Sequence, residues 1–134
     1  MKSLAQATLT LLPFCLLACG GGNTHEALAK QSLATMDKLA TTLEGVKDKA
    51  SWDAAKPALE KVLDTLGGIA TKVKALPKPD AAMSKKLQES LGKQMGDIQK
   101  RMMGATMKLA TIKEIGPDVA TFMKKMGQRM KDMK

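Results

Sequence analysis

Aromatic and imidazole side chains are scarce in this sequence of 134 residues, which has no Tyr, one Trp, two Phe and one His. Proteins that bind nucleic acids by base stacking depend on aromatic side chains, so nucleic acid is not an expected partner. A single His excludes any site that needs two imidazole ligands. The length suits one domain rather than two.

Cysteine is also scarce, and both cysteines, Cys15 and Cys19, lie close to the N-terminus. The chain begins with a short positive segment at Lys2, continues with an apolar stretch over residues 9–18, and has a small residue directly before Cys19. The apolar stretch is too short to cross a bilayer core of ~30 Å as a helix. These features are typical of a secretory signal peptide.

The residues Leu16-Leu17-Ala18-Cys19 resemble the lipobox of bacterial lipoproteins. The resemblance is confined to the signal peptide and the Gly-rich segment that follows it. It implies that residues 1–18 are removed, that Cys19 carries lipid, and that residues 19–23 form a flexible tether. Gly20 stands where lipoproteins of the inner membrane often have Asp, which favours the outer membrane, facing the periplasm. The alternative is an ordinary signal peptide cut elsewhere, with Cys19 as a free thiol.

Loss of Cys15 with the signal peptide and acylation of Cys19 would leave no thiol for a disulfide, a metal or a nucleophile. The remaining domain, residues 24–134, must then be held together by its apolar core. A chain of this length is long enough to form one.

Apolar residues recur every three or four positions through most of residues 24–134, and no stretch alternates with a period of two. The pattern therefore predicts helices and no strands. Ser51 and Asp80 are the expected N-caps of the second and third helices, and Pro77 and Pro79 separate these two helices. Because the connections are short, we expect an all-α antiparallel bundle of three long helices plus a short C-terminal helix. The predicted helices cover residues 24–49, 52–76, 81–115 and 117–133.

Two local patterns add detail. The third helix gains apolar residues at Met103, Met107 and Ala110, which predicts that its second half is the more buried one. Gly67-Gly68 lies inside the second helix, where each Gly costs about 1 kcal/mol relative to Ala. A close contact with a neighbouring helix would offset part of this cost.

The order of helix, short turn, helix, double-proline loop and helix is similar to that of periplasmic four-helix cytochromes of the b type. That family ligates haem through a His late in its last helix, whereas no His follows His25 here. We therefore expect neither haem nor another cofactor. The carboxylates are dispersed among lysines in pairs typical of solvated helix faces, and no Ser has a His base within a plausible distance. The sequence predicts that the protein is not an enzyme.

Methionine and positive charge are concentrated in the second half of the chain. Eight of the eleven Met lie between Met95 and Met133, and residues 77–134 have a net charge of +7 against +1 for residues 24–76. The last predicted helix places basic and Met side chains together in a candidate interaction surface made of Lys124, Lys125, Arg129, Lys131, Met123, Met126, Met130 and Met133.

This Met-rich helix has three interpretations. Its Met side chains fill the core or a groove, because Met is flexible and apolar. Alternatively, its basic face binds an anionic envelope surface or a protein partner. As a third possibility, the thioethers hold Cu(I) or Ag(I), since soft ligands select soft metals. We predict a non-enzymatic interaction module anchored to the membrane through lipid on Cys19, with soft-metal binding as the alternative.

Overall fold

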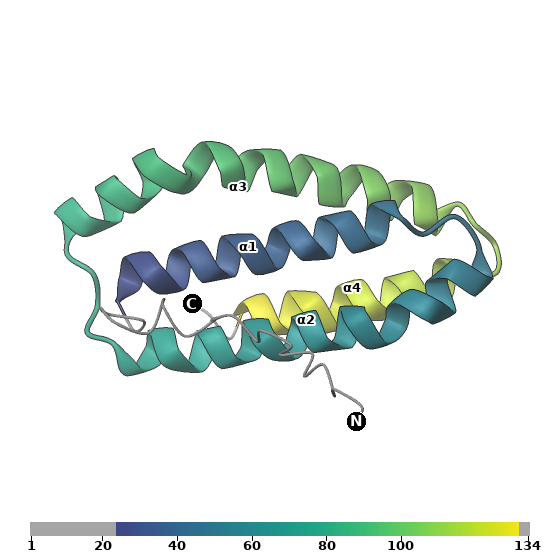
Figure 1. The fold of residues 1–134 in the computed structure, drawn as a ribbon, viewed down its shortest axis with the longest axis horizontal. Helices are drawn as coiled ribbons and strands as arrows, with labels where there is room; N and C mark the ends of the chain where they lie inside the picture. Colours follow the sequence, from purple (N-terminus) through teal and green to yellow (C-terminus); the bar gives the residue numbers. More distant parts are fainter. Residues whose placement is uncertain (1–23, 132–134) are drawn as a thin grey trace, which may run out of the picture.

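The computed structural model describes residues 24–131; the predicted signal peptide, the tether and the last three residues lie outside this range. The described chain forms α1 (His25–Glu44), α2 (Lys49–Ala75), α3 (Ala81–Ala110) and α4 (Gly116–Lys131), and it contains no strand (Figure 1). The prediction of an all-α fold is confirmed. Over residues 24–131, no helix has the length and apolar character needed to cross a bilayer.

The four helices pack around one core, and consecutive helices run in opposite directions (Figure 1). α1 packs against α2 and α3, and α4 packs against the same two helices. α1 and α4 are therefore diagonal to each other, as are α2 and α3. With 16 residues, α4 is ~24 Å long, whereas the 30 residues of α3 span ~45 Å. α4 consequently covers one half of the bundle and leaves the other half with three helices (Figure 1).

The turn between α1 and α2 is longer than the sequence pattern indicates. α1 ends at Glu44, and α2 begins at Lys49 with Asp48, not Ser51, as its N-cap. The Asp48 carboxylate accepts the backbone N–H of Ser51 at 2.8 Å, while the Ser51 hydroxyl accepts that of Asp48 at 3.0 Å. This reciprocal pair is a capping box, in which Ser51 is the third residue of the helix.

α3 also ends earlier than predicted, at Ala110. The backbone N–H groups of Thr111 and Ile112 bond to carbonyls three residues before them, which tightens the last turn. The chain then reverses at Gly116, where an added Cβ would lie 3.1 Å from the Ala110 carbonyl oxygen. This close approach favours glycine, and it lets the preceding Ile115 sit fully buried in the core.

The predicted N-cap Asp80 is confirmed, and Thr24 is the N-cap of α1. The Thr24 hydroxyl accepts the backbone N–H of Ala27 at 3.2 Å and begins α1. The Asp80 carboxylate accepts the backbone N–H of Met83 at 2.6 Å and begins α3 after the double-proline loop. Short polar side chains at these positions satisfy N–H groups that have no partner inside the helix.

The core face of α3 is narrower than predicted. Met103 and Met107 are 65% and 66% exposed, so the expected widening of the apolar face is wrong. The expectation that the second half of α3 is the more buried one is nevertheless confirmed, because all four buried residues of this helix lie there. Both neighbours of α3, α1 and α4, lie on the same side of it, and the opposite side faces solvent. The buried residues of α3 are Ile98, Met102, Ala105 and Leu109.

Candidate functional site

The Met side chains of α4 attach this helix to the bundle. Met126 is 5% exposed, and Met123 and Met130 are half-buried against the core. The Thr106 hydroxyl donates to the Met102 carbonyl oxygen at 2.7 Å and lies 3.7 Å from the Met123 sulfur, which brings α3 and α4 into contact. Met133 lies outside the described residues. Core packing accounts for these three Met, and nothing in the described chain favours the soft-metal interpretation.

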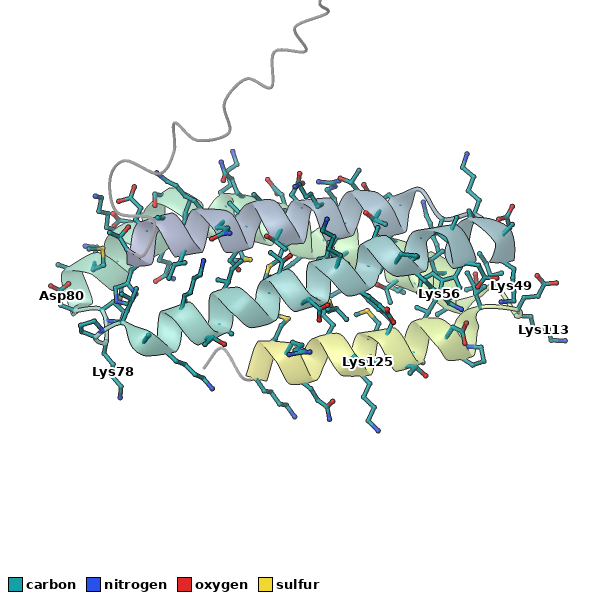
Figure 2. All side chains as sticks on the ribbon, turned by 60° about the horizontal axis from the view of Figure 1, so that its bottom comes forward. Lys49, Lys56, Lys78, Asp80, Lys113 and Lys125 are labelled. Carbon is teal, nitrogen blue, oxygen red and sulfur yellow. The ribbon has the colours of Figure 1, made fainter. Side chains whose placement is uncertain are left out.

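The lysines of α4 are exposed. Lys124, Lys125 and Lys131 take part in no ion pair within residues 24–131. Figure 2 shows Lys125 extending from α4 away from the body of the bundle. Lys125 also lines a groove between α2 and α4, whereas Lys124 and Lys131 lie toward the α3 side of the helix.

Arg129 differs from these lysines because it is held against α2. Its Nη2 lies 3.8 Å from a carboxylate oxygen of Asp64. A Cβ added at Gly67 would meet Nη1 of Arg129 at 3.0 Å, while one added at Gly68 would meet nothing within 4 Å. The close approach predicted at Gly67-Gly68 is therefore confirmed at Gly67 alone, and the partner is a side chain.

The solvent side of α3 also carries lysines. Lys93, Lys100, Met103 and Met107 are exposed and recur at helical spacing, so they share one face of α3. Neither Lys93 nor Lys100 forms an ion pair in the described part of the chain. We define the α3–α4 surface as these four residues together with Lys124 and Lys131. It places two large apolar side chains among four cations.

Cations elsewhere on the bundle are partly neutralised. Arg101 joins α3 to α1 through two hydrogen bonds to Glu44, at 2.9 and 2.7 Å, and an ion pair with Asp37. The hydrogen bond from Arg101 lowers the pKa of Glu44. Lys86 similarly bonds to Glu26 across the same two helices, at 3.4 Å. The unpaired cations of the α3–α4 surface therefore contrast with the paired ones between α1 and α3.

A second network joins the beginnings of α2 and α4. The Trp52 Nε1–H donates to Asp118 at 3.2 Å, and Lys56 Nζ lies 3.0 Å from the same carboxylate oxygen. The Trp52 ring meets Phe122 edge to face, with ring centres 6.2 Å apart. The hydrogen bond from Lys56 is the main reason that the pKa of Asp118 is lowered. Trp52 is only 2% exposed, so this network closes one end of the core.

Acid is expected to destabilise the fold through these carboxylates. Hydrogen bonds from Lys56 lower the folded-state pKa of Asp53 and Asp118. In the unfolded chain the pKa of both carboxyls returns to about 4. Their contribution to the free energy of unfolding is therefore fully present above that pH and is lost as the pH falls through the lowered folded-state pKa values. We expect the urea midpoint to fall below about pH 4. The variant Asp118→Asn should show a smaller drop between neutral and acidic pH, and an equal drop would contradict this assignment.

His25 links α1 to the loop between α2 and α3. Its Nε2 lies 2.6 Å from the carbonyl oxygen of Pro77 and donates to it when that nitrogen carries the proton. The contact spans 52 positions along the chain, so no local pattern reveals it.

The grooves on the described bundle differ in their lining. A groove of about 390 Å³ lies at the start of α1, between α2 and α3, and has no Asp, Glu, Lys or Arg in its wall. A larger groove, of about 710 Å³ between α1 and α3, includes Glu26, Lys86 and Arg101. Charged residues also line three further grooves. Residues 24–131 bring no three His, Cys, Asp or Glu side chains together in a way that would hold a metal ion.

Comparison of the chain with protein-family models, with curated proteins and with solved structures finds no match.

Proposed function

We propose that this protein is a non-enzymatic, lipid-anchored protein of the bacterial cell envelope whose α3–α4 surface contacts an anionic membrane. The anchor is lipid on Cys19, and the location is the periplasmic face of the outer membrane. The proposal rests on the lipobox-like sequence at residues 16–19 and on the composition of the α3–α4 surface.

The observation that carries the proposal is the position of Met103 and Met107. They are two of the three large apolar side chains exposed on the described bundle, and they share their face of α3 with Lys93 and Lys100, which form no ion pair within residues 24–131. A polybasic surface gains about 1 kcal/mol per Lys or Arg close to an anionic membrane. Apolar side chains among these cations add contact with the boundary between headgroups and acyl chains. A solubilising surface alone would not need exposed Met at these positions.

The first test is sedimentation with vesicles. The chain from residue 19 with Cys19→Ser, which removes the anchor, is expected to bind vesicles containing phosphatidylglycerol at low salt and to dissociate as salt rises. Binding to neutral phosphatidylcholine vesicles should be weak. Equal binding to both kinds of vesicle, or binding that salt does not change, would contradict electrostatic recognition.

A matched pair of variants locates the binding surface. Replacing Lys93, Lys100, Lys124 and Lys131 with Gln should weaken binding to anionic vesicles at least tenfold, since each Lys contributes ~1 kcal/mol. The control replaces four exposed lysines of α1 and α2 that form no ion pair within residues 24–131, and so has the same net charge. These are Lys38, Lys61, Lys72 and Lys74. Equal losses in both variants would show that net charge, and not this surface, determines binding.

The anchor has a separate test. Mass spectrometry of the protein isolated from bacterial membranes should find an N-terminal Cys19 with the mass of two or three acyl chains. Such chains contribute ~0.8 kcal/mol for each buried methylene and hold the protein stably at the membrane. An intact free thiol at Cys19 would contradict the lipoprotein assignment.

A further inference from the structure

The short α4 leaves an apolar groove at the end of the bundle where α1 begins. The floor of this groove includes Leu28, which is fully buried, and the α2 wall includes Ile69. On the other side, α3 supplies the half-buried Leu87, Leu91 and Met95. None of the residues of α4 up to Lys131 lines this groove, and Arg129 meets α2 at Gly67. In a complete four-helix bundle, the fourth helix would cover these α2 and α3 residues.

The groove suits an alkyl chain in length and chemistry. Its residues on α1 run from His25 to Leu33, and those on α3 from Leu87 to Met95, which is ~12 Å along each helix. A bilayer core of ~30 Å is two acyl chains thick, so a single chain spans ~15 Å. The absence of charged side chains from the wall means that an alkyl chain would not displace water from an ionised group.

The groove also lies within reach of Cys19. Thr24 is five residues after Cys19, and a fully extended chain of five residues spans at most ~17 Å. His25, the next residue, is part of the groove wall. The connecting residues 20–23 include three Gly, a composition typical of linkers between domains. A chain attached through so short a linker reaches a local concentration in the millimolar range.

We infer that this groove binds one acyl chain of the lipid on Cys19 whenever the protein is away from a membrane. The inference rests on the proposed lipidation of Cys19. Exposure of an acyl chain to water costs ~0.8 kcal/mol per methylene, and the groove provides an apolar surface for part of that chain. The membrane also removes the acyl chain from water. Because one acyl chain cannot occupy the groove and the membrane at once, the groove-bound and membrane-inserted states of that acyl chain exclude each other.

A chemical substitute for the lipid tests this inference. In the chain from residue 19, Cys19 is the single thiol, so dodecyl maleimide attaches an alkyl chain at that position alone. Compared with protein that carries the ethyl group of N-ethylmaleimide, dodecyl protein should remain monomeric at micromolar concentration. Its melting temperature should rise by about 5 °C or more, because the chain binds the folded state and not the unfolded one.

Two glycines of α3 provide a matched pair of variants. Gly92 lines the groove, and a Cβ there would meet only the Gln88 side chain, at 3.9 Å. Gly96 is one turn further along and outside the groove, with nothing within 4 Å of an added Cβ. Gly92→Trp should fill the groove and abolish the rise in melting temperature of dodecyl protein, whereas Gly96→Trp should preserve it. Both changes remove a helix-destabilising Gly, so both variants should fold.

Three results would overturn the inference. The first is equal melting temperatures for ethyl and dodecyl protein, and the second is an equal response of the two Trp variants. The third is a rise in melting temperature that depends on protein concentration, which would mean that the alkyl chain binds a second copy of the protein. None of these results depends on whether the bacterium attaches lipid to Cys19. The mass measurement described above decides that question separately.

Discussion

Replacing Trp52 with Ala is expected to lower the free energy of unfolding by about 3–5 kcal/mol, the largest loss predicted for any single change in this protein. Trp52 is 2% exposed and makes an edge-to-face contact with Phe122. Its removal leaves a cavity at the junction of α2 and α4 and takes away the donor that binds Asp118. A loss of this size is a large fraction of the 5–15 kcal/mol that stabilises a typical domain.

Urea denaturation followed by far-UV circular dichroism measures this loss, since the variant has no Trp for fluorescence. Trp52→Phe is the control, because it keeps an aromatic ring while it removes the indole N–H and part of the ring volume. We expect it to lose ~1 kcal/mol for the hydrogen bond plus a smaller cavity cost. If Trp52→Ala lost less than about 1 kcal/mol, the contact with Phe122 would not be what attaches α4 to α2.

The double variant Met103→Gln, Met107→Gln is expected to bind anionic vesicles about tenfold or more weakly, with its stability unchanged. Both side chains are about two-thirds exposed in the free protein, so their replacement leaves no cavity in the core. Complete burial of one Met contributes about 1.5–3 kcal/mol. Partial insertion of two therefore reaches the 1.4 kcal/mol that corresponds to tenfold in affinity.

Vesicle sedimentation and urea denaturation, done together, separate the two effects. Met83→Gln is the control on the same helix, since Met83 is 36% exposed but lies outside the α3–α4 surface. It should bind vesicles as the unchanged protein does. Unaltered binding by the double variant would limit the role of this surface to its lysines.

The helices could be predicted from the sequence because each depends on a local pattern. Residues such as Leu39, Leu43, Leu59 and Leu63 recur at helical spacing, and Asp80 follows a double-proline break. The pattern predicts an end of the first helix that is five residues too late, because polar residues 47–49 are compatible with both helix and turn. The two reciprocal hydrogen bonds between Asp48 and Ser51 resolve this ambiguity. Each bond needs both residues, so neither residue alone indicates where α2 begins.

The candidate site was predicted only in part, because exposure depends on which helices become neighbours. In α3, the series Ile98, Met102, Ala105 and Leu109 already forms a full buried stripe, and Met103 and Met107 lie one and two positions after members of it. Periodicity cannot tell whether that stripe is wide or narrow. The basic character of α4 is plain from the sequence, whereas the pairing of Arg129 with Asp64 depends on the docking of α4 on α2.

The same reason applies to the apolar groove. The short length of the last helix is evident in the sequence, but its diagonal position relative to α1 is a property of the assembled bundle. Contacts such as Trp52 with Asp118, 66 positions apart, determine which half of the bundle α4 covers. Local patterns carry no information on such contacts.

The position of α1 has a mechanical consequence. This helix packs between α2 and α3, and its side chains at Leu28, Leu39 and Ala40 are fully buried. It is also the helix that directly follows the proposed anchor. A pulling force transmitted from the membrane through Cys19 would therefore act on a helix whose interfaces with α2 and α3 share the resistance. Had the anchor been attached to α4, the same force would peel away the shortest helix first.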